Sequence, residues 1–202
     1  MLDMTGPQNS PIYTDRLVLR ALAPTDIAEF MAIAGDFEVA RMTSDIPHPL
    51  DEGRARIWLA PSPGEARFAI VRDGRMIGSA GYFRRSAHTA ELGFWLGRAW
   101  WGQGYTTEAG RAIVRHGFDV GRLALFTSSH FLDNPASERV LAKLGFVPTG
   151  SGRIWSAARG HDVAADLLEL TRERAEALIE LAPVETKQSR WSALIERVRG
   201  AG

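Results

Sequence analysis

A glycine-containing segment in the middle of the chain constrains the fold more than any other feature. Residues 100–109 read WWGQGYTTEA and follow an apolar run over residues 92–96. After the segment, apolar residues recur at helical spacing from Ala109 to Val120. The order is therefore strand, glycine loop, helix. Glycine lets backbone N–H groups turn toward a ligand, and a helix N-terminus adds free amides and a positive dipole, so the segment predicts a phosphate or pyrophosphate site.

Two common phosphate loops do not fit this segment. A P-loop needs a lysine and then Ser or Thr after its second glycine, whereas Tyr105 follows Gly104. A dinucleotide fingerprint needs a third glycine three residues after the second, where this chain has Thr107. The spacing therefore argues against a P-loop nucleotide and against a nicotinamide dinucleotide.

Length and composition are those of an ordinary globular protein. The chain has 202 residues, 45% hydrophobic and 24% charged, which fits one domain with an appendage. We expect a lead-in over residues 1–13, a main domain over 14–181 and a helical extension over 182–202. The extension carries an apolar stripe at helical spacing, made of Trp191, Leu194, Ile195 and Val198.

Charge and residue usage exclude several kinds of chemistry. The formal net charge is zero, which argues against nucleic acid as the main partner. The chain has no cysteine, so a covalent acyl-cysteine intermediate is excluded, and its five histidines do not cluster as metal ligands would. We see neither a signal-peptide pattern nor an apolar run of about 18 residues. These observations predict a cytoplasmic protein that uses no metal and no membrane.

Periodicity and turn residues predict an α+β fold, a mixed and mostly antiparallel sheet with helices on both faces. Asp73-Gly74 is typical of a tight hairpin. In the first helix, Ala28, Met31 and Ala32 suit the packed side. Strands are expected at 16–21, 65–72, 76–84, 90–96, 123–129, 146–156 and 163–171, and helices at 24–34, 51–59, 106–120, 134–144 and 172–181.

Four stretches together resemble the GNAT N-acetyltransferases. Residues 14–20 (TDRLVLR) resemble an opening strand of that family, and residues 91–96 (ELGFWL) its central strand. WGQGYTTEA resembles its pyrophosphate loop, and residues 134–146 its next helix. The RimJ/RimL-like branch, which includes acetyltransferases of ribosomal-protein N-termini, is the closer match. The loop departs from the superfamily pattern at Ala99, where Arg or Gln is common.

The resemblance implies a donor site for acetyl-CoA as co-substrate. The central strand and the strand after the loop's helix would splay apart, and the pantetheine arm would lie in the gap. The helix residues Arg139 and Lys143 would reach the 3′-phosphate or remain solvated charges, and Thr106 and Thr107 could equally serve as helix caps. The expected cofactor-binding residues are Phe94, Trp95, Leu96, Gly102, Gln103, Gly104, Tyr105, Thr106, Thr107, Asn134 and Lys143.

The resemblance also suggests the catalytic residues. Glu91, at the start of the central strand, is the first candidate for the base that deprotonates the amine, with His130 and His48 as other candidates. Many superfamily members protonate the thiolate with a tyrosine, but Leu141 stands at that position here. In the RimJ/RimL-like branch a serine lies near the sulfur, which would be Ser137. Asn134 and Ser137 also fit a helix cap, so capping remains the alternative.

These features predict an acetyl-CoA-dependent N-acetyltransferase that works by direct attack of a primary amine. The acceptor is a protein N-terminus or a small-molecule amine, and its site would be built from residues 36–50 and 155–162. The alternative is a catalytically degenerate module that binds CoA and acts in regulation or interaction. A homodimer is possible, and the C-terminal stripe could serve it.

Overall fold

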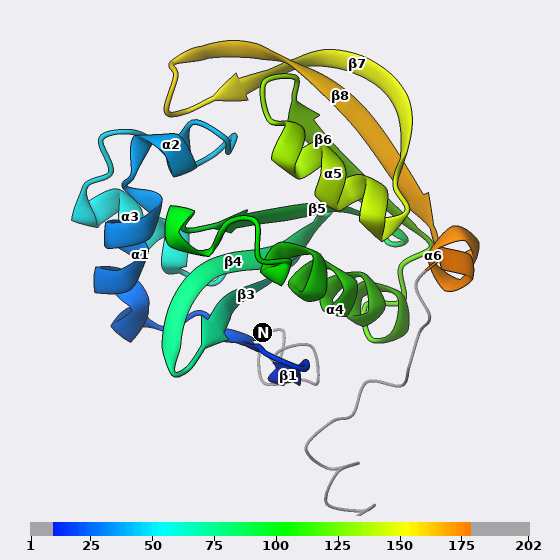
Figure 1. Ribbon diagram of the computed structural model, residues 1–202, viewed down its shortest axis with the longest axis horizontal. Coiled ribbons are helices and arrows are strands. Elements are labelled where there is room, and N and C mark those ends of the chain that lie inside the picture. The colour runs from blue at the N-terminus through cyan, green and yellow to red at the C-terminus, as the bar shows by residue number, and fades with distance from the viewer. Residues whose placement is uncertain (1–9, 179–202) are drawn as a thin grey trace, which may run out of the picture.

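The computed structural model describes residues 10–178 and shows an α+β fold built on one eight-stranded sheet. The sheet order is β1-β2-β3-β4-β5-β6-β8-β7 (Figure 1). Its strands are β1 (Ile12–Tyr13), β2 (Val18–Ala21), β3 (Glu65–Arg72), β4 (Arg75–Arg84), β5 (Thr89–Leu96), β6 (Leu125–Phe131), β7 (Val147–Ser156) and β8 (His161–Thr171). The α-helices are α1 (Ile27–Ala34), α2 (Phe37–Ala40), α3 (Glu52–Leu59), α4 (Tyr105–Asp119), α5 (Pro135–Leu144) and α6 (Arg172–Leu178), with short 3-10 turns η2 (Pro24–Asp26) and η3 (Arg98–Trp100).

Strand pairing confirms the mixed, mostly antiparallel sheet. Every neighbouring pair is antiparallel except β5 and β6, which are parallel. That parallel pairing covers only three residues of each strand and ends at Glu91↔Thr127. Beyond this point β5 and β6 separate, as the resemblance implied. The sheet is therefore split at its centre.

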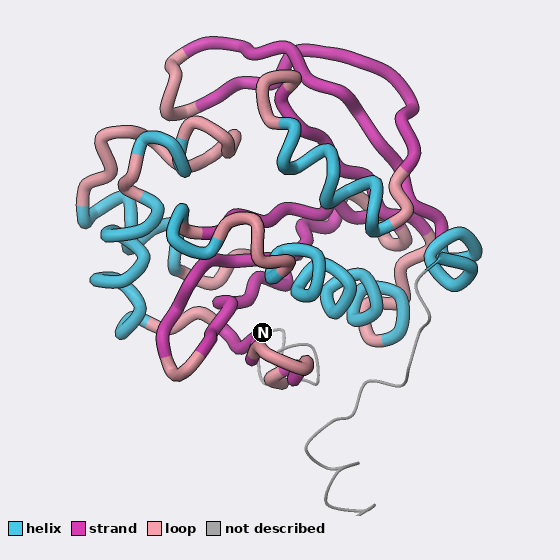
Figure 2. Tube along the Cα trace, viewed as in Figure 1, coloured by secondary structure: helices cyan, strands magenta, loops and turns pink. Residues whose placement is uncertain are grey.

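Two hydrophobic cores lie on opposite faces of the sheet, because successive strand residues point to opposite sides. On β3, Phe68 and Ile70 belong to the core under α4 and α5, whereas Ala69 and Val71 belong to the core under α1 and α3. Figure 2 shows the helices in these two groups around the strands.

Some details differ from the sequence-based expectations. The sheet already begins at β1, inside the expected lead-in. In α1 the packed side carries Phe30 and Ala34, with Met31 partly buried, whereas Ala28 and Ala32 are exposed. The expected C-terminal extension and its apolar stripe lie outside the described residues. Within residues 10–178, the helices are too short or too polar to cross a membrane.

Candidate active site

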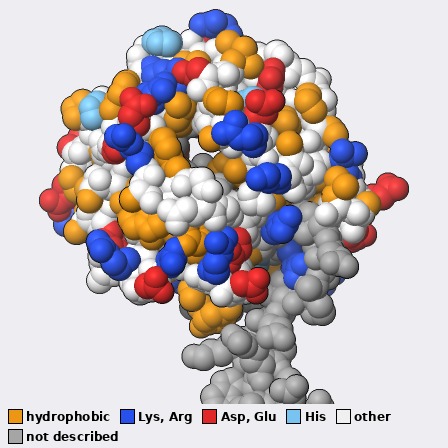
Figure 3. Space-filling model, viewed as in Figure 1, with side chains coloured by type: hydrophobic (Ala, Val, Ile, Leu, Met, Phe, Trp, Pro, Cys, Tyr) orange, Lys and Arg blue, Asp and Glu red, His pale blue; other side chains and the backbone are white. Residues whose placement is uncertain are grey.

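A cavity of about 630 Å³ opens where β5 and β6 separate. Its wall combines β5 and β6, the loop before α4, the start of α5 and the segment after α2. Figure 3 shows the hollowed face of the molecule, where Lys and Arg side chains gather. The cavity thus reaches both faces of the sheet through the gap between the two strands.

The backbone of β5 offers hydrogen-bonding groups to this gap. The Gly97 amide donates to Ile77 O. In this register the backbone N–H and C=O of Trp95 point toward β4, whereas the backbone groups of Phe94 and Leu96 point toward the gap. The Ser128 hydroxyl donates to Leu92 O at 3.0 Å, and the Trp101 indole donates to Leu96 O at 2.6 Å. Within residues 10–178, no strand pairs with Phe94 on this side, because the β5–β6 pairing has already ended.

The glycine loop has the backbone shape of an anion site. Gly102 and Gly104 adopt φ values of 73° and 82°, which glycine alone tolerates readily. Gly104 is the N-cap of α4 and provides no side chain to cap the helix. The amides of the first helical residues are therefore left for a ligand. Since the N-cap is Gly104, Thr106 and Thr107 are not N-caps, and both line the cavity.

Two of the expected loop residues point elsewhere. The Tyr105 side chain is buried on the far side of the loop, with the Arg16 guanidinium 4.4 Å from its ring centre. The side-chain amide of Gln103 donates from Nε2 to Ala99 O at 3.0 Å. For these two residues, only the backbone can take part in a phosphate site.

Helix α5 brings the other expected donor-side residues to the cavity. Asn134 is its N-cap, and Asn134 Oδ1 accepts a bond from the Ser137 amide at 3.1 Å. Ser137 lines the cavity, as do Arg139 and Lys143 farther along the helix. Leu141 is fully buried in the core. The side chains of Asn134, Ser137 and Lys143 therefore share one wall with the glycine loop.

Glu91 lies on the opposite face of the sheet from α5 and is the last residue of β5 that pairs with β6. It lines the cavity. Arg85 Nε donates to Glu91 Oε2 at 2.9 Å, and Arg85 Nη2 bonds the same oxygen. Arg85 thus holds the carboxylate through Oε2.

The two histidine candidates differ in position. His130 lines the cavity and is buried, with its Nδ1 3.1 Å from Phe131 O. His48 is exposed and lies outside the cavity wall, where its ring contacts Phe37. Among residues 10–178 no group of three His, Asp or Glu side chains could hold a metal ion.

The cavity wall on the Glu91 face of the sheet contains residues that the sequence analysis did not single out. Arg67 pairs with Glu65 at 2.8 Å and stacks on the Trp58 ring, 4.0 Å from its centre. The Trp58 indole donates to Asp45 at 2.8 Å. Burial lowers the pKa of Arg67. All four side chains line the cavity, but they come from distant segments and carry no motif in the sequence.

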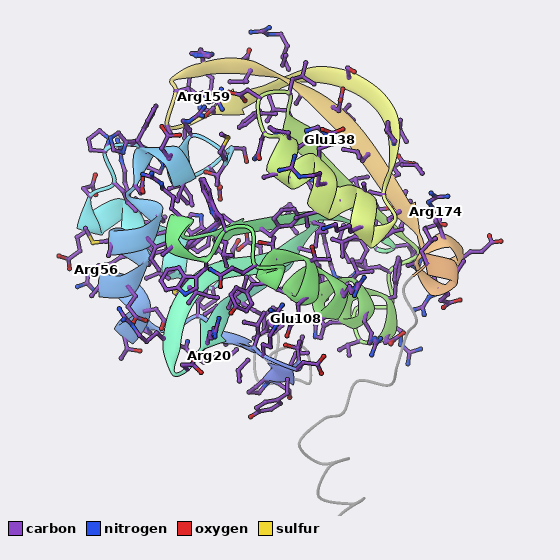
Figure 4. The ribbon with its side chains drawn as sticks, in the orientation of Figure 1. Arg20, Arg56, Glu108, Glu138, Arg159 and Arg174 are labelled. Carbon is purple, nitrogen blue, oxygen red and sulfur yellow. The ribbon has the colours of Figure 1, made fainter. Side chains whose placement is uncertain are left out.

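A second charged cluster forms around Asp133, which lies in the cavity wall. Arg159, in the β7–β8 turn, donates to both oxygens of Asp133 at 2.9 and 3.0 Å and to Arg41 O at 2.9 Å. Arg41 also pairs with Asp133. The Arg159 bonds lower the pKa of the Asp133 carboxyl. Figure 4 shows Arg159 at the tip of β7 and β8, beside the segment after α2.

Comparison with known proteins agrees with this geometry. Residues 16–147 match the family model described as the acetyltransferase (GNAT) domain. The chain belongs to the GNAT acetyltransferase family. It is therefore a GNAT N-acetyltransferase, and the donor that this family uses is acetyl-CoA.

Curated relatives are distant but cover much of the chain. N-acetyltransferase p20 of Bacillus licheniformis, whose function is uncharacterized, is 26% identical over 80% of this chain and 96% of the relative. L-amino acid N-acetyltransferase AaaT of Escherichia coli is 25% identical over 74% of this chain and 94% of its own. The ribosomal-protein-serine acetyltransferase of Escherichia coli is 33% identical over 41% of this chain and 48% of its own.

Solved GNAT structures share the fold. A GCN5-related N-acetyltransferase from Brucella melitensis superposes with a TM-score of 0.73 at 19% identity, covering 88% of this chain and 87% of its own. RimJ of Mycobacterium smegmatis, solved with CoA-disulfide, has a TM-score of 0.66 at 20% identity, covering 85% and 92%. The expected GNAT fold is confirmed.

Proposed function

We propose that this GNAT protein acetylates a primary amine by direct attack on acetyl-CoA, with donor and acceptor meeting in the gap between β5 and β6. The observation that carries the proposal is the continuity of the cavity. One wall holds the glycine loop and Ser137, and the opposite face of the sheet holds Glu91. A thioester laid through the gap would present its carbonyl carbon to an amine on the Glu91 side.

Each proposed residue has a chemical task. The free amides at the start of α4 bind the pyrophosphate, aided by Thr106 and Thr107, and Lys143 approaches the 3′-phosphate. The backbone of Phe94 and Leu96 pairs with the pantetheine arm. Glu91 takes the proton that the amine loses, directly or through a water. As the carbon–sulfur bond breaks, the Ser137 hydroxyl donates a proton to the departing thiolate and regains one from water.

We propose an acceptor with a free amino end, either a protein α-amine or a small-molecule amine. Membership of the RimJ/RimL-like branch is part of this proposal and is supported by the matches to ribosomal-protein acetyltransferases. Similarity to AaaT supports the small-molecule alternative. The expected homodimer and cytoplasmic location stay predictions.

The test is thiol release from acetyl-CoA with a panel of amines. The panel should pair peptides bearing a free N-terminus with the same peptides blocked at that amine, and should include free amino acids. Release with a free amine, together with a mass increase of one acetyl group on that amine, is expected. If CoA binds but no amine in the panel or in a cell extract is acetylated, the chain is a CoA-binding module instead.

A further inference from the structure

The opening sequence motif TDRLVLR lies directly behind the glycine loop. The Thr14 hydroxyl donates to Glu108 Oε1 at 2.6 Å, and the Arg16 amide donates to the same oxygen at 2.8 Å. Arg16 Nε donates to Glu108 Oε2 at 2.7 Å. Figure 4 shows Glu108 on the side of α4 nearest the opening strands. Two stretches more than 90 residues apart are thereby joined at both oxygens of one carboxylate.

Arg16 also holds the backbone of the loop itself. Its Nη1 donates to Gln103 O at 3.1 Å. A Cβ added to Gly104 would lie 3.5 Å from Arg16 Nη2, so the guanidinium sits close against this peptide. The carbonyl of Gln103 and the amide of Gly104 point in opposite directions, because the peptide between them is planar and trans. The bond from Arg16 therefore turns the Gly104 N–H away from Arg16.

A bound phosphate would need the Gly104 N–H to point in this direction, toward the cavity. Gly102, Gly104, Thr106 and Thr107 line the cavity, whereas Arg16 does not belong to its wall. A peptide held from behind by Arg16 thus presents its N–H on the side of the ligand. Anion sites of this kind depend on several N–H groups pointing at one place.

The charges of Glu108 and Arg16 also support a role for this pair in pyrophosphate binding. Glu108 lies in the first turn of α4, where an unpaired carboxylate would repel a bound pyrophosphate. Its side chain is only 16% exposed and its charge is matched by Arg16. Burial favours the neutral acid, but the bonds from Thr14 and Arg16 prevail and lower the pKa of Glu108. Arg16 therefore neutralises the anion nearest the loop.

We propose that Arg16 and Glu108 are positioning residues for the donor, a pair that sets the loop for pyrophosphate from outside the binding site. This inference rests on the proposed function, since it assumes that the loop binds the pyrophosphate of acetyl-CoA. The pair acts on the diphosphate end of the donor and leaves the acetyl-transfer end unaffected.

The experiment compares two acetyl donors, one with and one without the diphosphate end. Calorimetry measures the affinity for CoA, and kcat/KM is measured with acetyl-CoA and with S-acetylpantetheine, which has no pyrophosphate. For Arg16→Met we expect about tenfold weaker CoA binding and an equal loss of kcat/KM with acetyl-CoA. The kcat/KM of Arg16→Met with S-acetylpantetheine should stay within about twofold of the kcat/KM of the unmodified protein.

Two further variants keep the test decisive. Arg16→Lys retains the charge beside Glu108 but loses the fork that reaches Gln103 O, so it should weaken CoA binding by a smaller factor. In a Glu108→Gln background, Arg16→Met should cost less than it does alone, because the partner charge is already gone. Arg16→Lys also serves if Arg16→Met does not fold.

The matched control is Arg72→Met. The Arg72 guanidinium lies 4.7 Å from the centre of the Tyr105 ring, as Arg16 does at 4.4 Å, but Arg72 has its ion pair with Asp73 rather than Glu108. CoA affinity should be unchanged in this variant. Equal losses with both donors, or CoA binding unaffected in both Arg16 variants, would overturn the positioning role. An unmodified protein that does not bind CoA would instead refute the proposed function.

Discussion

Ser137 makes two separate interactions at the start of α5, one through its backbone and one through its side chain. Its amide donates to Asn134 Oδ1 and so completes the helix cap. The residue also lines the cavity, and its hydroxyl is the group we propose as proton donor. The helix cap depends on the backbone amide of Ser137, whereas the proposed proton donor is its hydroxyl. A substitution that removes only the hydroxyl can therefore separate the two roles.

We expect Ser137→Ala to slow CoA release about a hundredfold without lowering the melting temperature, because alanine keeps the amide that completes the cap. Stopped-flow detection of free thiol and a thermal melt give the two values. Asn134→Ala is the stability control, since loss of the capping oxygen should cost about 1 kcal/mol. An unchanged rate of CoA release in Ser137→Ala would exclude the proton-donor role.

Glu91→Gln should lower kcat about a hundredfold and flatten the rise of kcat at alkaline pH, because glutamine cannot accept the proton of the amine. The measurement is a pH–rate profile at saturating acetyl-CoA. Glu65 lines the cavity from the same face of the sheet and is paired with Arg67, as Glu91 is with Arg85, but it lies two strands away from Glu91 and from the gap between β5 and β6. Glu65→Gln should therefore keep the shape of the profile. Full activity and an unchanged profile in Glu91→Gln would disprove its role as the base.

At the scale of elements, the position of α4 decides where the loop amides point. The helix approaches the sheet closely at Gly117, where an added Cβ would lie 2.2 Å from Phe126 Cζ. It approaches α5 at Gly110, where a Cβ would lie 2.8 Å from Leu144 Cδ1. Two glycines thus set the depth at which α4 packs. The loop at its N-terminus is carried to the edge of the gap by this packing.

Gly117→Ala should destabilise the protein by up to about 2 kcal/mol. Overpacking against Phe126 costs about 1–3 kcal/mol, and the better helix propensity of alanine offsets about 1 kcal/mol of it. Chemical denaturation gives the free energy of unfolding. Gly150→Ala is the control, because a Cβ there would have no atom within 4 Å and its φ is not positive. Equal stability of the two variants would contradict this account of the packing.

At the scale of the whole molecule, the split in the sheet joins the donor and acceptor compartments. β4 and β5 stay paired along the cavity, whereas β5 and β6 do not. Contacts between distant segments then hold the halves around the gap. The Ala157 amide donates to Ser44 O at 3.0 Å, and Arg41 pairs with Asp133 at 3.2 Å. Carboxylate bonds of this kind make the stability of the whole fold depend on pH.

The free energy of unfolding should decrease as the pH falls below about 5. Asp26, Glu108 and Asp133 have pKa values lowered in the folded protein. Their contribution is fully present above their ordinary pKa and is lost as they become protonated. Asp26 should contribute most, because it is buried and bound at both oxygens by Arg20, whereas Asp133 is half exposed.

Denaturation at a series of pH values checks this expectation, and Asp26→Asn should flatten the decrease. Asp73→Asn is the control, because the Asp73 carboxylate is 87% exposed in its pair with Arg72. A slope that Asp26→Asn leaves unchanged would contradict the assignment to this carboxylate.

Most elements followed from local patterns, but the packed side of α1 did not. Strand β3 coincides with its expected range, and α4 and α5 begin within one residue of theirs, because glycines and apolar periodicity mark these elements clearly. In α1, small alanines suit either side of a helix, and the bulky Phe30 decided which side packs. The Arg159–Asp133 contact had no local signal, since its partners meet only in the folded chain.

The sequence by itself determined the order of elements, the glycine loop, and with it the kind of donor. These features depend on neighbouring residues, whose spacing fixes backbone shape directly. The tertiary structure alone decided that Glu91 shares a cavity with Ser137, that Arg16 supports the loop from behind, and which charges line the acceptor side. Such contacts join residues far apart in the chain, and no local spacing encodes them.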